Sequence, residues 1–549
     1  MKIRFLGANT SVTGSCHLIT TDHHKFLLDC GQFQGSNEME ELNYEEFDFD
    51  PAEIEFLILS HAHIDHSGRI PLLVKRGFKG KIYCTDATAD LLDIMLRDSA
   101  SIHERETEWK NRKRQRAGKP LIEPLYTIQD AEDALNHVVP VLYNQLFEIN
   151  DTVKFVFNDA GHILGSSIVE LFITENEEVS KIVYSGDLGA TGKPILRDPT
   201  IIKKADYLIM EATYGDRIHE ENSDSIEKLI DIVLKTTRRG GTVVIPSFAV
   251  GRTQELIFQF NCFYEEHSEY KDELNNIMVY VDSPMAISAT EVFRRNAQVF
   301  DDETRDCILR GDHPLDFVNL RFTRTTSESV SLNTNTSPKV IISSSGMCEA
   351  GRIKHHLKHN LWNSKSSIVF VGYQAKGTLG YSILNGDKKV SIFGEKIDVK
   401  AEIYNLEGFS GHADKNGLVE WLGGFRQQPR QIFLVHGEEQ AKHTLAKEIK
   451  DRLGYNCTII DGDTEYTLTK DDIVSVEEIK KELVSQEALF TIKKRIASLH
   501  NALETILYNT HLAIGASNTP EQVITINNII LELEKNIYNL GSAMSIESQ

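Results

Sequence analysis

The chain has 549 residues and a formal net charge of -22. This length is too great for one hydrophobic core and predicts roughly two to four domains. So negative a charge argues against a protein that coats nucleic acid without specificity, although bound cations and a local basic cleft still let an acidic protein receive phosphates. No apolar run reaches the ~20 residues that span a bilayer, and the N-terminus lacks the features of a signal peptide. We therefore expect a cytoplasmic protein without membrane contact.

The first part of the sequence alternates short apolar runs with turns. Strands are predicted at 25–31 and 54–60, and strand candidates recur at 153–157, 168–173, 181–185 and 207–210. Each ends near a polar or charged residue. This order of strands, turns and short helices predicts α/β layers.

A polar helical region is predicted between residues 97 and 135. It carries a run of basic residues, and such a run is typical of a solvated helix face. A contribution to the path of a nucleic acid is the less favoured alternative. The run consists of Lys110, Arg112, Lys113, Arg114 and Arg116.

A separate α/β unit is predicted from residue 213 to 390, where runs at 240–247, 276–281 and 339–343 each combine a strand with a small-residue loop. Because His412 and His436 follow this unit, we expect it to be inserted into the first domain. Residues 470–549 contain no obvious strand and are predicted to form a helical C-terminal extension. Its apolar stripe indicates a packing face, with a modest preference for a homodimer or a protein partner over packing within the chain.

Four potential metal ligands lie within six residues, directly after a predicted strand. His61, His63, Asp65 and His66 are hard to explain by packing, because clustered imidazoles bury badly without partners. Histidine nitrogen and carboxylate oxygen are the ligands that borderline divalent ions favour. The seven cysteines are scattered without a C-x-x-C pair, which argues against a thiolate zinc site and a disulfide framework.

Four residues cannot fully enclose two metal ions, so further ligands are expected at other strand ends. His162, Asp187 and His436 each follow a predicted strand and adjoin glycine. Glycine lets the backbone and a ligand crowd a metal. Each of the three residues would be a weak candidate alone.

Together these motifs resemble the metallo-β-lactamase superfamily and, within it, the β-CASP nucleases. The resemblance covers residues 1 to 465, and the motifs recur in family order. They are Asp29, the segment from His61 to His66, His162, Asp187, Glu211 in Glu211-Ala212-Thr213-Tyr214-Gly215, His412 in Gly411-His412-Ala413, and His436. The resemblance implies an αββα sandwich made of residues 1–212 and 391–465, with an α/β β-CASP domain inserted at 213–390.

The resemblance also implies how the ligands are divided between two zinc ions, with manganese as an alternative metal. One ion would take His61, His63 and His162, the other would take Asp65, His66 and His436, and Asp187 would bridge them. Asp29 would orient the histidine loop. Without the resemblance, Asp29 would be interpreted as a turn aspartate.

The implied reaction is hydrolysis of an RNA phosphodiester. Two metals about 3.5–4 Å apart activate a shared water and offset charge on the phosphate oxygens. Asp65 is counted with the catalytic residues for this reason. His412, assisted by Glu211, would donate a proton to the leaving ribose oxygen, since a carboxylate beside an imidazole favours its protonated form. The alternative for His412 is a turn residue at the entry to a helix.

Loops of the inserted domain are implied to hold the RNA backbone. Such loops can present backbone N–H groups and hydroxyls to an anion. Small-residue loops after strands are also common in any α/β fold, so these assignments are the least specific of the site. The candidates are Ser247, Arg252, Ser283, Ser345 and Gly346.

A zinc-dependent ribonuclease of RNA processing or decay is the leading functional hypothesis. A DNA nuclease of the same superfamily is an alternative, but DNA-cutting relatives typically carry valine at the last motif, where this chain has His436. A small-molecule hydrolase would lack both the inserted domain and His412. A non-catalytic scaffold subunit would have lost metal ligands, whereas this chain retains all seven. The choice between endonuclease and 5′-exonuclease stays open.

Overall fold

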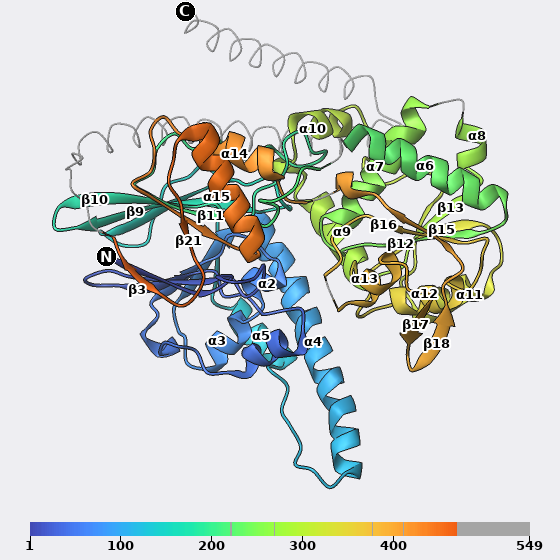
Figure 1. Cartoon of the computed structure of the whole chain (residues 1–549), viewed down its shortest axis with the longest axis horizontal. Coiled ribbons are helices and arrows are strands. Elements are labelled where there is room, and N and C mark those ends of the chain that lie inside the picture. The colour runs from blue at the N-terminus through green and yellow to red at the C-terminus, as the bar shows by residue number, and fades with distance from the viewer. Residues whose placement is uncertain (220–221, 268–269, 376, 410, 469–549) are drawn as a thin grey trace, which may run out of the picture. The chain divides into compact units, whose positions relative to one another are not determined.

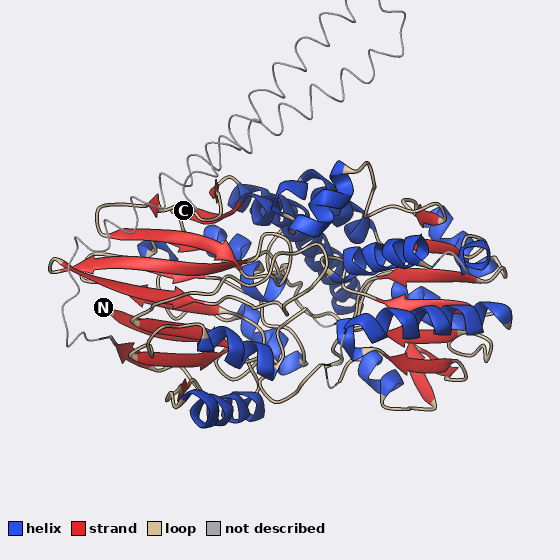
Figure 2. Ribbon diagram, turned by 90° about the horizontal axis from the view of Figure 1, so that it is seen from above, coloured by secondary structure: helices blue, strands red, loops and turns tan. Residues whose placement is uncertain are grey.

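The computed structural model describes residues 1–219, 222–267, 270–375, 377–409 and 411–468. The helical extension predicted at 470–549, with its proposed partner surface, lies outside these residues. Two seven-stranded sheets and one six-stranded sheet organise the described chain (Figures 1 and 2). Among the described helices, none is both long enough and apolar enough to cross a bilayer.

The two seven-stranded sheets form the first unit. The first sheet runs in the order β22 (Glu465–Thr467), β1 (Lys2–Gly7), β2 (Cys16–Thr20), β3 (Lys25–Leu28), β4 (Phe56–Ile58), β5 (Lys81–Thr85) and β6 (Val138–Val141). The second runs in the order β21 (Thr458–Ile459), β20 (Gln431–Val435), β11 (Tyr207–Glu211), β10 (Glu178–Tyr184), β9 (Ser167–Glu175), β8 (Val153–Asp159) and β7 (Phe147–Glu148).

Apolar side chains fill the space between these two sheets. Phe26 and Ile58 of the first sheet belong to the same buried cluster as Phe155 and Leu171 of the second. Side chains of opposite parity along the strands point outward and are covered by helices. The outer helices are α3 (Ile70–Lys75), α4 (Asp86–Arg116) and α5 (Ile128–Leu135) on one side, and α14 (Lys415–Gly423) and α15 (Glu439–Leu453) on the other. The predicted αββα sandwich is therefore confirmed.

The strands of the third sheet come from the segment of chain that connects β11 to β20, two neighbouring strands of the second sheet. β11 and β20 pair in parallel, with Glu211 opposite Val435. The intervening chain forms a wholly parallel sheet in the order β14 (Leu320–Phe322), β13 (Met278–Val281), β15 (Lys339–Ser343), β12 (Thr242–Pro246), β16 (Ser367–Phe370) and β19 (Glu402–Asn405). Because β19 pairs with β16, residues 402–405, which were expected in the first unit, supply the edge strand of the inserted one.

Helices cover both faces of this parallel sheet, as its apolar strands require. They are α6 (Asn222–Arg238), α7 (Arg252–Glu266), α8 (Lys271–Leu274), α9 (Pro284–Arg295), α10 (Asp302–Leu309), α11 (Thr326–Thr334), α12 (Ile353–Asn360) and α13 (Leu379–Leu384). A separate hairpin consists of β17 (Lys389–Ile392) and β18 (Glu395–Asp398). Two short helices of the first unit, α1 (Asn37–Glu41) and α2 (Ile64–Ser67), follow strands of the first sheet.

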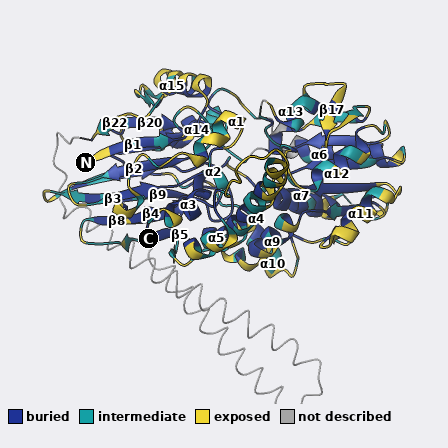
Figure 3. Cartoon of the chain, turned by 90° about the horizontal axis from the view of Figure 1, so that it is seen from below, coloured by how far each residue is buried: buried dark blue, intermediate teal, exposed yellow. Residues whose placement is uncertain are grey.

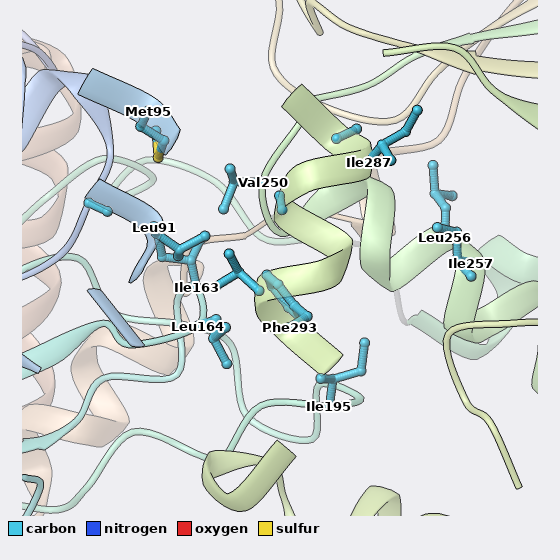
Figure 4. Packing of buried hydrophobic residues seen from close by; sticks show 14 of the residues in the cluster. Leu91, Met95, Ile163, Leu164, Ile195, Val250, Leu256, Ile257, Ile287 and Phe293 are labelled. Atoms are coloured by element: carbon cyan, nitrogen blue, oxygen red, sulfur yellow. The ribbon is translucent and has the colours of Figure 1, made fainter. Parts of the chain in front are cut away.

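A continuous buried cluster joins the first unit to the inserted one. Leu91 and Met95 of α4, Ile163 of the loop after β8, and Phe293 of α9 all belong to it, and Figure 4 shows them gathered at this junction. The side chain of Asn296, just after α9, donates a hydrogen bond to Asp90 of α4 at 2.8 Å. The loop that carries Ile163 is thus packed between the two units.

Replacing Leu171 with alanine tests the core between the two sheets. Leu171 is fully buried, and a buried leucine-to-alanine change costs roughly 2–5 kcal/mol of unfolding free energy. Leu309→Ala is the matched control, because Leu309 ends α10 and is 52% exposed. Chemical denaturation should show a large loss for the first variant and a change within about 0.5 kcal/mol for the second. Equal losses would contradict the assigned core.

Candidate metal centre

The predicted ligands converge at one edge of the sandwich. His61 and His63 follow β4, and Asp65 and His66 lie in α2. His162 follows β8 in the second sheet, Asp187 follows β10, and His436 follows β20 directly. Strands of both sheets therefore deliver side chains to the same place.

Four of these residues form one group of ligand atoms. One ligand atom from each of His61, His63, His162 and Asp187 lies within 4.8 Å of all the others. Nδ1 of His63 is 3.2 Å from Nε2 of His61 and 3.1 Å from Nε2 of His162. Oδ2 of Asp187 is 3.5 Å from Nε2 of His61. Three imidazole nitrogens and one carboxylate oxygen thus face a common point.

Three further residues form a second group beside the first. One ligand atom from each of Asp65, His66 and His436 meets the same 4.8 Å limit. Nε2 of His66 is 3.1 Å from Nε2 of His436, which is 3.5 Å from Oδ2 of Asp65. Oδ1 of Asp187 is 3.3 Å from Nε2 of His66. Asp187 therefore directs one oxygen toward each group.

The protonation of three of the candidate histidines suits metal binding. Burial lowers the pKa of His61 and His162 well below the ordinary histidine value, and lowers the pKa of His63 to about 4. These imidazoles are therefore neutral at physiological pH, as a metal ligand must be. Oδ1 of Asp187 is buried and accepts no hydrogen bond from the described residues, so a cation is the partner that this oxygen lacks. The donor set and the neutral state of these three imidazoles fit the implied metals. Asp187 and Asp29 outweigh burial and raise the pKa of His66, which must lose its Nε2 proton to serve as a ligand.

Asp29 fixes the orientation of the histidine loop. Its Oδ2 accepts a hydrogen bond from Nδ1 of His66 at 2.7 Å, which leaves Nε2 of His66 free to face the second group. Its Oδ1 accepts from the backbone N–H of Ser60 at 2.7 Å. The backbone of Asp29 is left-handed, with φ of 59°, a conformation that costs about 1–3 kcal/mol for a non-glycine residue. The hydrogen bonds offset that cost.

Two other residues that orient ligands were missed by sequence reasoning. The hydroxyl of Tyr184 donates to Oδ2 of Asp29 at 2.7 Å. The hydroxyl of Thr213 lies 3.0 Å from Nδ1 of His436. Thr213 stands inside the motif that begins at Glu211, which is the one signal in the sequence that could have singled it out.

Two glycines beside the candidate ligands are required because neighbouring chain segments lie too close for a side chain. Gly186 has φ of 53°, and a Cβ atom there would lie 2.9 Å from Cβ of Ser60. A Cβ on Gly161, which has φ of 68°, would lie 2.7 Å from a backbone oxygen. A side chain at Gly186 would push the Asp187 loop away from Ser60 and the histidine loop, and one at Gly161 would displace the His162 loop from the chain at 197–199.

His412 and Glu211 lie next to the first ligand group. Nδ1 of His412 is 3.2 Å from Oε2 of Glu211, the last residue of β11. The His412 ring is 4.3 Å from the ring of His162, centroid to centroid. Burial alone would lower the pKa of His412, but the carboxylates of Glu211 and then Asp187 outweigh it and raise the pKa above the ordinary value. The pair can therefore hold a proton beside the candidate ligands. One atom each of Asp187, Glu211 and His412 also meets the 4.8 Å limit.

The predicted substrate residues of β12 and β13 are tied into their own loops. Ser247 is buried, and its hydroxyl accepts from Thr253 at 3.0 Å. Arg252, at the start of α7, donates to Glu255 at 2.5 Å. Ser283 caps α9 by accepting from the backbone N–H of Ala286 at 3.2 Å. These contacts shape the loops, and binding of substrate by these residues stays a prediction.

The loop after β15 carries the remaining two substrate candidates. The Ser345 hydroxyl accepts from the backbone N–H of Glu349 at 3.2 Å and so closes its own turn. A Cβ on Gly346 would lie 3.0 Å from the ring of Phe248, which is 39% exposed. Gly346 thus makes room for an exposed aromatic ring that sequence reasoning did not identify.

Asp282, which directly follows β13, holds these loops together through its buried carboxylate. Sequence reasoning did not identify this role. Its carboxylate accepts hydrogen bonds from Arg352 and His356, each at 2.6 Å, and from Ser329 at 2.5 Å. Burial would raise the pKa of Asp282, but these donors and Thr323 outweigh burial and hold the pKa well below the usual range. The buried carboxylate thus ties the β13 and β15 loops to α11 and α12.

An αββα sandwich with this converging set of histidines and carboxylates defines a metallohydrolase. Three family models match the chain: the metallo-β-lactamase superfamily over residues 10–245, the Beta-Casp domain over 253–383, and the Zn-dependent metallo-hydrolase RNA specificity domain over 396–460. The chain belongs to the metallo-β-lactamase superfamily and to its β-CASP family, as its motifs predicted.

Curated relatives match most of the chain. Ribonuclease TTHA0252 of Thermus thermophilus is 37% identical over 447 residues, which are 81% of this chain and 95% of the relative. The transcription termination factor FttA of Methanocaldococcus jannaschii is 32% identical over 80% of this chain and 67% of the relative. FttA of Methanosarcina mazei is 32% identical over 82% of this chain and 69% of the relative.

Replacing Asp29 with asparagine tests whether its carboxylate orients the candidate ligand His66. Asparagine keeps the shape but removes the charged acceptor for His66, and loss of such a partner typically lowers metal affinity about 10- to 100-fold. Asp463→Asn is the control, because Asp463 pairs with Arg4 at the surface. Metal titration of the chelator-treated proteins measures the effect, with thermal unfolding as the check on folding. Unchanged affinity in a folded Asp29→Asn protein would contradict this role.

Proposed function

We propose that this protein is a zinc-dependent ribonuclease that hydrolyses RNA phosphodiester bonds. The observation that carries the proposal is Asp187, whose two carboxylate oxygens face two separate groups of ligands beside the His412–Glu211 pair. The 37% identity to a ribonuclease over 95% of that relative supports RNA as the substrate. It also favours a ribonuclease over the alternative of a DNA nuclease. The retained ligands disfavour a scaffold subunit.

Two zinc ions fit the ligand groups, with manganese as the alternative metal. His61, His63 and His162 would hold one ion, Asp65, His66 and His436 the other, and Asp187 would serve both. The chemistry that the ions supply when bound is Lewis acidity toward phosphate oxygens and activation of a water nucleophile.

The protein's own residues position the substrate and move the proton. Attack of the water oxygen on phosphorus breaks the bond to the ribose 3′ oxygen, which leaves with a negative charge. With Nδ1 of His412 donating to Glu211, the proton on Nε2 of His412 is the one available to that oxygen. The products are a 5′-phosphate end and a 3′-hydroxyl end.

A cytoplasmic location belongs to the same proposal. All seven cysteines are free thiols, and three of them are only partly buried. Free cysteines are typical of proteins from reducing compartments. A homodimer or protein partner bound through residues 470–549 stays a prediction.

Labelled RNA and DNA of one sequence test the proposal. Zinc-loaded protein should cleave the RNA at least about tenfold faster than the DNA and carry two zinc ions per chain by elemental analysis. His63→Ala and Asp65→Ala should lose cleavage while remaining folded. A time course with 5′-phosphate and 5′-triphosphate RNA separates internal cleavage from attack at the 5′ end. A well-metallated protein that leaves the RNA intact would contradict the proposal.

His412→Ala tests the proton donor separately from the metals. Loss of a general acid lowers kcat by about 10²–10⁴-fold, whereas zinc content should stay unchanged because His412 is not needed to hold either ion. Glu211→Gln should lower kcat less, because it removes the carboxylate that raises the pKa of His412 but keeps the imidazole. If His412→Ala also loses its zinc, His412 acts as a metal ligand instead.

A further inference from the structure

The C-terminal part of α4 leaves the body of the protein as a basic arm. α4 has 31 residues, and Thr107 is the last of them to be buried. In Figure 1 this end of the helix projects beyond the rest of the described chain, and in Figure 3 its surface is largely exposed. We call residues 108–122 the α4 arm.

The arm has a charge opposite to that of the chain. Residues 109–119 contain six basic side chains and no acidic one, whereas the chain as a whole carries -22. Arg112 pairs with Glu108 at 3.5 Å, but both side chains are about 70% exposed, so the pair contributes little. Lys113, Arg116 and Lys119 form no ion pair within the described chain. Their charge is therefore available to an external anion.

An aromatic ring is exposed among these cations. The side chain of Trp109 is 57% exposed, and Nζ of Lys113 lies 3.4 Å from its ring centroid. Aromatic rings interleaved with basic residues are the combination that binds single-stranded nucleic acid, because bases stack on the ring and phosphates meet the cations.

The arm is an ordered hairpin of helix and returning loop. The side chain of Asn111 donates to the backbone oxygen of Ile122 at 2.8 Å and accepts from its N–H at 2.9 Å. Nε of Arg114 donates to the backbone oxygen of Pro120 at 2.5 Å. These bonds hold the chain return against the helix, so the cations and the ring are presented on a fixed surface.

The same helix reaches the metal centre at its other end. Leu91 packs with Ile163, the residue after the candidate ligand His162 (Figure 4). Further along α4, Nε2 of His103 is 3.4 Å from the side chain of Gln32, which adjoins the loop of Asp29. From Leu91 to Lys113 the helix rises about 33 Å at about 1.5 Å per residue. α4 therefore links the metal centre rigidly to the arm.

We propose that the α4 arm binds single-stranded RNA outside the cleavage site, through Trp109 and the cations Lys113, Arg116 and Lys119. This inference rests on the proposed ribonuclease function. A stacked strand advances about 3.4 Å per nucleotide, so about 10 nucleotides match the length of α4 from Leu91 to Lys113. The arm then raises the affinity for long RNA and leaves short RNA unaffected.

A substrate-length experiment tests the arm. The arm variant is Lys113→Gln/Arg116→Gln/Lys119→Gln. The control variant is Lys25→Gln/Lys79→Gln/Lys81→Gln, which changes three exposed cations at the starts of β3 and β5, away from the strand ends that carry the candidate ligands. The arm variant should raise KM about tenfold for RNA of about 25 nucleotides and leave KM for about 8 nucleotides and both kcat values unchanged. The control variant should match the unaltered protein on both lengths.

Binding without cleavage separates the arm from the catalytic proposal. In an Asp65→Asn background, long RNA should show a salt dependence whose logarithmic slope falls by about 2 when three phosphate contacts are lost. Trp109→Ala should weaken binding about tenfold, and Trp109→Phe should keep most of the affinity because stacking is retained.

Each remaining outcome decides between the two proposals. Equal KM, salt slope and affinity for the arm variant and its control would overturn the RNA-binding arm and leave an acidic protein as the partner of this surface. Tighter binding of single-stranded DNA than of RNA through the arm would overturn RNA as its ligand. Absence of cleavage by the unaltered protein, with arm-dependent binding intact, would overturn the ribonuclease proposal alone.

Discussion

The carboxylate of Asp187 is buried between two groups of imidazoles, and the edge of the sandwich is built around that charge. An ionised carboxylate in a protein interior costs several kcal/mol unless cations compensate it. Burial keeps His61 and His63 neutral, so they supply ligand atoms but no positive charge. His66, whose pKa Asp187 and Asp29 raise against the effect of burial, and His412, whose pKa Glu211 and Asp187 raise, can balance part of it. The remaining imbalance is what a divalent cation relieves, and this ties the stability of the edge to the metal.

The backbone at this edge carries strain for the same reason. Asp29 and His436 both have left-handed backbones, with φ of 59° and 48°. Hydrogen bonds hold both: Asp29 through Ser60 and Tyr184, and His436 through its N–H, which donates to Ala8 at 2.7 Å. His436 and Glu211 are brought together because β11 and β20 are parallel neighbours. A whole domain can enter between these strands without separating Glu211, of the proposed proton-donating pair, from the candidate metal ligand His436.

The ligand cluster was predictable from sequence because four of its members lie within one six-residue segment that follows a strand. The distant ligands needed family motifs, since a histidine after a strand is common. Tyr184 and Asp282 escaped because their roles depend on tertiary contacts that leave no local pattern: one is an ordinary strand tyrosine and the other a turn aspartate. The strand β19 was placed in the wrong unit for a similar reason, as only its pairing with β16 reveals its sheet. The α/β layers, by contrast, follow from strand periodicity and order, whereas the αββα arrangement came from the resemblance to the family.

Because the chain has a net charge of -22, local clusters of cations decide where it can bind a polyanion. An acidic body repels a polyanion at long range, and the repulsion is screened beyond about 8 Å at physiological ionic strength. Affinity for RNA must then come from local sites where cations are concentrated, namely the metal centre and a basic surface such as that around Lys113. Because the body repels phosphates elsewhere, a strand held at both places is aligned along α4 rather than bound at random. The same acidity that argues against a non-specific coating protein thus favours an enzyme that binds RNA in one register.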